Sequence, residues 1–222
     1  MVIRFAICGD VRFISHHDTI RLFERALSRA QLPVKFSEGF NPRPQLSFPV
    51  PRAVGITGEA EVLLVGFSEP IDPEVVLSRL GEQMPAGIKM LAARSLEGKG
   101  KLRVDCAYYA VEITTEQSAA VSLALRGILE SRTWFVKRTV QEGEPGKMID
   151  LRSFLVEACA DAGELRWTLS VTDKGTVRPA EFLSAVGLDP RMFLHRVRRT
   201  AVRLSGDDQV GGDAGRQDTY QE

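Results

Sequence analysis

The same order of strand-like and helix-like segments occurs twice along this 222-residue chain, and this repetition constrains the fold more than any other feature. Apolar residues alternate with polar ones in the expected strands, and they recur every three or four residues in the expected helices. The first half reads as strand, helix, strands, helix and strand at residues 2–13, 16–32, 34–36, 46–50, 61–67, 73–83 and 88–94. The second half reads in the same order at residues 106–114, 116–131, 133–140, 148–158, 164–172, 178–186 and 193–204.

Two short segments, 73–78 (PEVVLS) and 179–184 (PAEFLS), also resemble each other, and each follows an expected strand. We therefore predict an α+β protein with two ferredoxin-like (βαββαβ-type) modules in tandem, each an antiparallel sheet with helices on one face. The modules are expected at residues 1–97 and 102–204. Residues 205–222 contain four glycines and almost no apolar side chains, so we expect a disordered tail there.

The charge of the chain is segregated although its formal net charge is zero. Residues 1–52 contain eight Lys or Arg against four Asp or Glu, and residues 151–205 contain nine against six. A zero net charge removes any whole-molecule attraction to nucleic acid or to a membrane surface. Anion binding would therefore depend on a local basic patch.

The cysteines and the missing motifs limit the chemistry that the chain can perform alone. Cys8, Cys106 and Cys159 are widely spaced and odd in number, which argues against a disulfide framework and fits a reducing cytoplasm. No apolar run reaches the roughly 18 residues of a membrane span. The sequence also lacks an iron–sulfur cysteine triad, a CxxC zinc motif and a glycine-rich nucleotide loop. We expect a cytoplasmic protein without membrane contact that binds no metal or redox cofactor itself.

The segment 12–51 concentrates polar side chains between two apolar runs, and it opens with Ser15, His16, His17 and Asp18 at the start of an expected helix. A histidine beside a carboxylate could act as a general acid or base near neutral pH, which makes His16 the candidate catalytic residue. The structural alternative is that Ser15 and Asp18 cap the helix while one histidine is buried. Adjacent histidines point about 100° apart on a helix, so at most one is expected to serve a given ligand.

Arginines are spaced to line one face of the same expected helix. Arg21, Arg25 and Arg29 follow one another at intervals of four residues, which places them in a row. Such a row could track the phosphates of RNA or another polyanion, or it could be a solvated face. A second basic run at 191–203 (RMFLHRVRRTAVR) reads as a strand. This run could complete a basic surface, or it could protect a sheet edge by its charge.

A turn rich in glycine and proline follows the helix at residues 37–44 (SEGFNPRP). Gly39 permits a positive φ, and the two prolines hold their preceding residues extended. Phe40 could be a platform on which a base stacks, or it could insert into the core. We expect the turn to present Arg43 beside the start of the first helix, where helix N–H groups favour an anion.

These residues resemble the signature of the radical SAM-linked (radical SAM-associated) family of unknown function. The pattern RF-x-SH-x-D-x-x-R-x-x-E-R-A matches residues 12–26, and S-x-GFNP-x-P-x-LS matches residues 37–47, with Gly55 beyond them. Shorter matches occur at residues 149–152 (IDLR), 178–179 (RP) and 199–201 (RTA). The chain departs from the pattern at His17, where an apolar residue is expected, and this departure favours His16 over His17.

The resemblance implies a partner. Members are similar either to standalone proteins or to domains fused to a cobalamin-binding radical SAM enzyme. The S-adenosylmethionine and the iron–sulfur cluster would then lie on that partner and not on this chain.

We predict an accessory substrate-binding module that acts with a separate radical SAM enzyme, with RNA as the candidate ligand. The predicted substrate-binding residues are Ser15, His16, Asp18, Arg21, Arg25, Ser37, Gly39, Phe40, Asn41 and Arg43. Two alternatives stay open. One is a metal-independent RNA-processing enzyme with His16 as general acid or base, by analogy of fold. The other is a pure protein-interaction adaptor.

Overall fold

The computed structural model describes residues 1–96, 102–138, 146–173 and 175–205, and these residues form a mixed α+β fold. The first half contains β1 (Val2–Ile7), η1 (Gly9–Phe13), α1 (His16–Arg29), β2 (Leu46–Ser47), β3 (Thr57–Val65), α2 (Pro73–Gly81) and β4 (Ile88–Arg94). The second half contains β5 (Val104–Glu112), α3 (Thr115–Glu130), β6 (Phe135–Arg138), β7 (Lys147–Asp150), η2 (Leu151–Ser153), β8 (Leu155–Asp161), β9 (Glu164–Ser170), α4 (Pro179–Ala185), α5 (Pro190–Phe193), η3 (Leu194–Arg196) and β10 (Arg198–Leu204). The predicted α+β class is confirmed. The predicted disordered tail lies outside the described residues, apart from Ser205.

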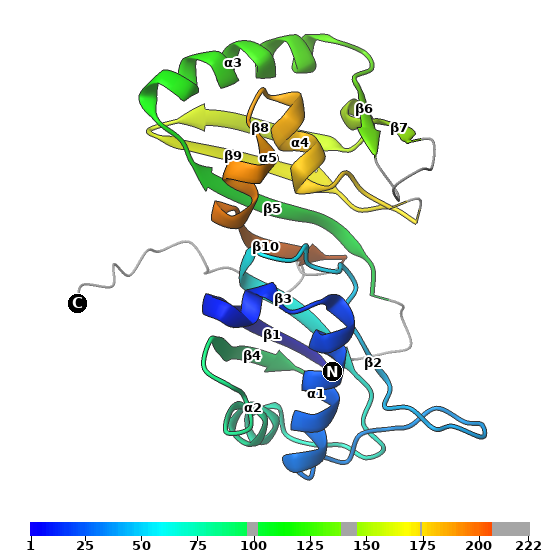
Figure 1. The fold of residues 1–222 in the computed structure, drawn as a ribbon. Coiled ribbons are helices and arrows are strands. Elements are labelled where there is room, and N and C mark those ends of the chain that lie inside the picture. Colours follow the sequence, from blue (N-terminus) through cyan, green and yellow to red (C-terminus); the bar gives the residue numbers. More distant parts are fainter. Residues whose placement is uncertain (97–101, 139–145, 174, 206–222) are drawn as a thin grey trace.

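One sheet of eight strands runs through both halves (Figure 1). Its order is β4-β1-β3-β10-β5-β9-β8, and β2 also pairs with β3. The pairings are antiparallel except for β10 with β3, which is parallel at Arg198 with Thr57 and at Arg199 with Gly58. The strands β6 and β7 form a separate two-stranded sheet. The predicted antiparallel character is therefore confirmed, but the expected modules share one sheet instead of having one each.

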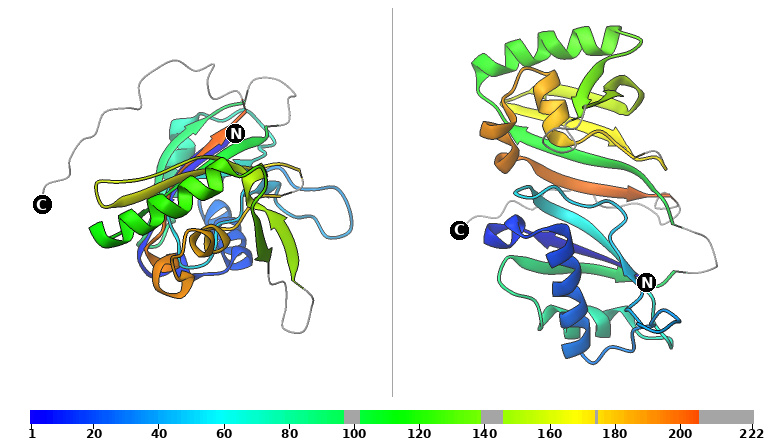
Figure 2. Two further views of the ribbon diagram at one scale, coloured as in Figure 1. Left: turned by 90° about the horizontal axis from the view of Figure 1, so that it is seen from above. Right: turned by 45° about the vertical axis from the view of Figure 1, so that its right-hand side comes forward.

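Each half buries an apolar core between its helices and its strands. In the first half, Phe23 of α1 packs on Phe5 of β1 with ring centroids 4.8 Å apart, and Val76 of α2 belongs to the same buried cluster. In the second half, Trp167 of β9 stacks on Phe182 of α4, with ring centroids 4.7 Å apart. Figure 2 shows α3 across one end of the molecule and α1 in the opposite half. Within the described ranges, no helix is both long enough and apolar enough to cross a membrane.

A buried ion pair joins the two halves at the place where β3 meets β10. Nε of Arg199 donates to Oε1 of Glu61 at 2.8 Å, and Nη2 of Arg199 binds both Oε2 of Glu61 and the backbone oxygen of Val50. Burial lowers the pKa of Arg199. The charges of Glu61 and Tyr109, together with their hydrogen bonds to Arg199, raise this pKa by more than burial lowers it, so the net shift is upward. A Cβ on Gly58 would lie 2.4 Å from Oε1 of Glu61, so only glycine leaves room for this carboxylate.

The second basic run occupies a different place from the one expected. The strand was predicted from residue 193, but α5 and η3 occupy residues 190–196 and β10 begins at Arg198. Asp189 caps α5, and Pro190 stands in its first turn. Because β10 lies between β3 and β5 in the middle of the sheet, the alternative of a charged edge strand is wrong.

Candidate nucleic-acid interface

The start of α1 is fixed by the side chain of Ser15. Its Oγ accepts a hydrogen bond from the backbone N–H of Asp18 at 3.1 Å and donates one to Oδ2 of Asp18 at 2.7 Å. The Asp18 carboxylate also lies in the first turn, where it suits the helix dipole. The structure thus gives Ser15 and Asp18 the capping role that the sequence left open beside the functional one.

The two histidines at this helix start have different surroundings. His16 is half-buried, and its ring meets Phe48 edge-on with centroids 6.0 Å apart. His17 is exposed, and its ring centroid lies 6.0 Å from that of His16. Burial, followed by the charge of His17, lowers the pKa of His16. The fold therefore favours the neutral form of His16.

The arginine row lines a groove between α1 and the turn that connects α2 to β4. This α1 groove has a volume of about 580 Å³ and is lined by Ile14, Asp18, Arg21, Leu22, Arg25, Arg29, Glu82, Gln83, Met84 and Pro85. Arg29 is held in place, because its Nη2 donates to the backbone oxygen of Gln83 at 2.8 Å.

The other two arginines of the row are less constrained. Arg21 lies 3.6 Å from Asp18, but both side chains are more than half exposed, and such a pair contributes little to stability. Arg25 is exposed, and its side chain forms no hydrogen bond or ion pair within the part of the chain that the structure describes. The α1 groove therefore presents at least one uncompensated guanidinium to solvent.

The predicted turn is a hydrogen-bonded hairpin that projects from the first half (Figure 1). In this 35–45 hairpin, the N–H of Ser37 donates to the oxygen of Arg43 at 2.8 Å, and the N–H of Arg43 donates to Oγ of Ser37 at 3.0 Å. Gly39 has a φ of +132°, a value that L side chains rarely adopt. The side chain of Phe40 is fully exposed (106 %), so the alternative that it inserts into the core is wrong.

The structure does not bring the hairpin and the start of α1 together. None of the residues 35–45 lines the α1 groove, and the hydrogen bonds of Ser37 and Arg43 close the hairpin on itself. Asn41 is exposed near the hairpin tip. The expected anion cradle of Arg43 beside the first turn of α1 is therefore not formed by any contact among the described residues.

A comparison with protein families identifies the family of this chain. Residues 1–179 match the family described as an uncharacterized protein conserved in bacteria (DUF2344). The chain belongs to this DUF2344 family. The match includes the α1 groove and the 35–45 hairpin, but it ends before β10. The comparison with curated proteins found no match.

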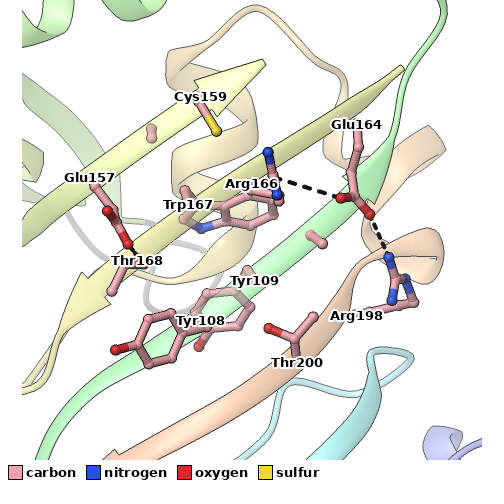
Figure 3. Close-up of a pocket in the computed structure, with 12 residues that line it drawn as sticks. Tyr108, Tyr109, Glu157, Cys159, Glu164, Arg166, Trp167, Thr168, Arg198 and Thr200 are labelled. Carbon is pink, nitrogen blue, oxygen red and sulfur yellow. Dashed lines mark hydrogen bonds and ion pairs between the residues drawn. The ribbon is translucent and has the colours of Figure 1, made fainter. Parts of the chain in front are cut away.

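A second pocket of the DUF2344 protein was not anticipated from the sequence. It has a volume of about 460 Å³ and lies over β5, β8, β9 and β10 (Figure 3). Arg198 is paired with Glu59 and Glu164, and Arg166 lies 3.8 Å from Glu164. The alternation of polar residues in the last strand indicates that one face of this strand is polar. The sequence of a single strand does not show which strands lie beside it, so the pocket could not be predicted.

The charges of this sheet pocket argue against a polyanion as its ligand. Oγ1 of Thr168 donates to Glu157 at 2.9 Å, so this carboxylate belongs to the pocket wall (Figure 3). The hydrogen bond with Cys106, followed by burial, raises the pKa of Tyr108 above its ordinary value of about 10, so the phenol adds no charge near neutral pH. The two lining arginines are matched by two lining glutamates. The α1 groove is therefore the better candidate for an anion.

The structure offers no metal centre in the ranges that it describes. No group of three or more His, Cys, Asp or Glu side chains is arranged there to hold an ion. Cys8 and Cys159 are exposed thiols, and Cys106 is a buried one.

Proposed function

We propose that this DUF2344 protein is an accessory module that binds an anionic substrate, with RNA as the candidate, for a separate radical SAM enzyme. The observation that carries the proposal is the α1 groove, where Arg21, Arg25 and Arg29 line one opening and Arg25 has no partner among the described residues. Repelling charges in a row destabilise a helix slightly, and phosphates along a nucleic-acid backbone would neutralise them.

The 35–45 hairpin supports a ligand with flat, stackable groups. Phe40 is fully exposed and Phe36 is half exposed (52 %) on the same hairpin. Stacking of a base on an exposed aromatic ring contributes about 1–3 kcal/mol in single-stranded nucleic-acid complexes. Because the hairpin and the α1 groove are separate, the proposed RNA would contact both sites through different nucleotides.

The architecture is consistent with two ferredoxin-like modules as part of this proposal. The first half has the order β4-β1-β3-β2 and the second half the order β10-β5-β9-β8, so the strand order is equivalent in the two halves. The radical SAM partner rests on the sequence resemblance alone, and S-adenosylmethionine and the iron–sulfur cluster are proposed for that partner.

Binding of total RNA at low and moderate salt tests the proposal. The double variant Arg21→Ala/Arg25→Ala is expected to bind more weakly. Each phosphate contact to a single strand contributes about 0.7 to the magnitude of the slope of log binding constant against log salt concentration. Removal of two contacts is therefore expected to decrease the magnitude of this slope by roughly 1.4. The matched control is Arg126→Ala/Arg132→Ala, which removes two exposed charges from the second half. Equal affinities and slopes for the two double variants would contradict the proposal.

An adaptor function is the second candidate, because exposed aromatic side chains also anchor protein interfaces. Phe40→Ala separates the two ideas. An RNA module loses affinity for RNA in this variant and recovers it in Phe40→Trp. An adaptor shows no RNA signal in any variant, but it co-purifies with a radical SAM protein and loses that partner in Phe40→Ala.

The enzymatic alternative has less support. His16 does not line the α1 groove, and its ring neighbours are Phe48 and His17. RNA cleavage that persists in EDTA and disappears in His16→Ala would favour an enzyme over a binding module.

A further inference from the structure

Three arginines from distant segments meet at a small cavity between the two halves, away from the α1 groove. This seam cavity has a volume of about 230 Å³ and is lined by Val50, Pro51, Arg52, Ala53, Ile56, Tyr109, Thr176, Val177, Arg178, Pro179 and Arg199. Arg52 precedes β3, Arg178 precedes α4, and Arg199 belongs to β10. None of the lining residues is acidic.

The positive charge around the seam cavity exceeds the negative charge. The buried carboxylate of Glu61 is bound to Arg199 and compensates only one guanidinium. Neither Arg52 nor Arg178 forms an ion pair with another described residue. Two guanidinium groups at the cavity therefore have no carboxylate in ion-pair contact among the described residues.

The position of Arg52 is set by the backbone and not by an acid. Its Nη1 donates to the oxygens of Arg12 at 2.7 Å, Ala53 at 3.1 Å and Ile56 at 2.6 Å. Burial is the largest cause that lowers the pKa of Arg52. The negative charge of Glu61 raises this pKa in part, and the positive charges of Arg199 and Arg12 lower it further. Nε of Arg12 is itself buried without a hydrogen-bond partner. The fold thus holds cations together at a cost that an anion would relieve.

We propose that the seam cavity binds a small oxyanion of the phosphate type, which bridges the two halves through Arg52, Arg178 and Arg199. Guanidinium groups match the geometry of phosphate oxygens and form charge-assisted hydrogen bonds with them. The volume corresponds to about seven or eight liquid waters at roughly 30 Å³ each. It admits inorganic phosphate or the phosphate end of a small phosphomonoester.

The fluorescence of Trp167 is a built-in reporter for this site. Its ring stacks on Tyr109, with centroids 5.3 Å apart, and Tyr109 lines the seam cavity. The full chain with Trp134→Phe retains Trp167 as its single tryptophan. Titration of this protein with inorganic phosphate, at constant ionic strength in sodium chloride, is expected to change the emission in a saturable way.

Variants of the exposed Arg178 test the site without disturbing the buried ion pair. Arg178→Gln is expected to weaken phosphate binding roughly tenfold or more, because a hydrogen bond to a charged group contributes about 1.5–3 kcal/mol. The matched control is Arg191→Gln, an exposed arginine at the start of α5, which is expected to leave binding unchanged. Arg52→Gln is a second test, with its folding checked by circular dichroism.

Four outcomes would overturn the inference, the last of them by replacing the class of ligand. The first is no saturable phosphate signal. The second is equal affinity for phosphate in the Arg178→Gln and Arg191→Gln proteins. The third is loss of phosphate binding in Arg21→Ala/Arg25→Ala, which would assign the anion to the α1 groove. Tighter binding of malate than of phosphate would replace the phosphate class by a dicarboxylate. Absence of RNA binding leaves this inference intact, since no residue of the α1 groove lines the seam cavity.

Discussion

At the scale of single residues, the protonation of His16 at the start of α1 makes the stability of the protein depend on pH. Burial and then the charge of His17 lower the pKa of His16 below its ordinary value of about 6.5. The unfolded chain therefore binds more protons than the folded protein once the pH falls toward 6.5, and stability decreases as the pH falls from there through the folded pKa. His16→Gln is expected to reduce the difference in the free energy of unfolding between about pH 7.5 and pH 5.5, measured by urea denaturation.

His17→Gln is the matched control. His17 is exposed, and its charge is the smaller of the two causes that lower the pKa of His16, so this variant is expected to change the pH dependence less than His16→Gln does. An unchanged pH dependence in His16→Gln would contradict the assignment. The preference for His16 over His17 came from the sequence pattern. In the structure the two histidines differ, since His16 is half-buried and His17 is exposed. The exposure of Phe40 could not be predicted in this way, because whether a loop phenylalanine meets a core depends on where the hairpin points.

At the scale of elements, β3 depends on a glycine. A Cβ on Gly58 would lie 2.4 Å from Oε1 and 2.7 Å from Cδ of Glu61, and Arg199 holds this carboxylate in place. Gly58→Ala is therefore expected to destabilise the protein by about 1–3 kcal/mol, as overpacking of a buried site does, measured by urea denaturation. Gly127→Ala in α3 is the matched control, because its Cβ would meet no atom within 4 Å. We expect this control to stabilise the protein by up to about 1 kcal/mol through helix propensity.

Equal effects of the two alanine substitutions would contradict the role of Gly58. Local periodicity located most elements, since α1, α2 and β4 follow from apolar spacing and caps that lie within each segment. It failed where a short helix interrupts a strand-like pattern. The start of α5 is marked by Asp189 and Pro190, and this capping signal outweighs the alternation that suggested a strand from residue 193.

At the scale of the whole molecule, one sheet runs through both halves. Strands β3 and β10 are far apart in sequence, and no local pattern in either strand specifies the other as its neighbour. Their parallel pairing, the Arg199–Glu61 pair and a third apolar cluster that includes Val62 and Val202 connect the halves. We therefore expect thermal unfolding in a single transition with equal calorimetric and van't Hoff enthalpies.

The buried pair provides the sharper test of this coupling. Glu61→Leu leaves the guanidinium of Arg199 buried without its counter-ion, so we expect a loss of about 3–5 kcal/mol in the free energy of unfolding. Arg199→Met added to Glu61→Leu removes the stranded charge, and the double variant is expected to recover most of that loss. A double variant as unstable as Glu61→Leu alone would show that the join relies on the shape of these side chains and not on their charges. Two separate thermal transitions in the double variant, against one in the wild type, would instead assign to this pair the cooperativity between the halves.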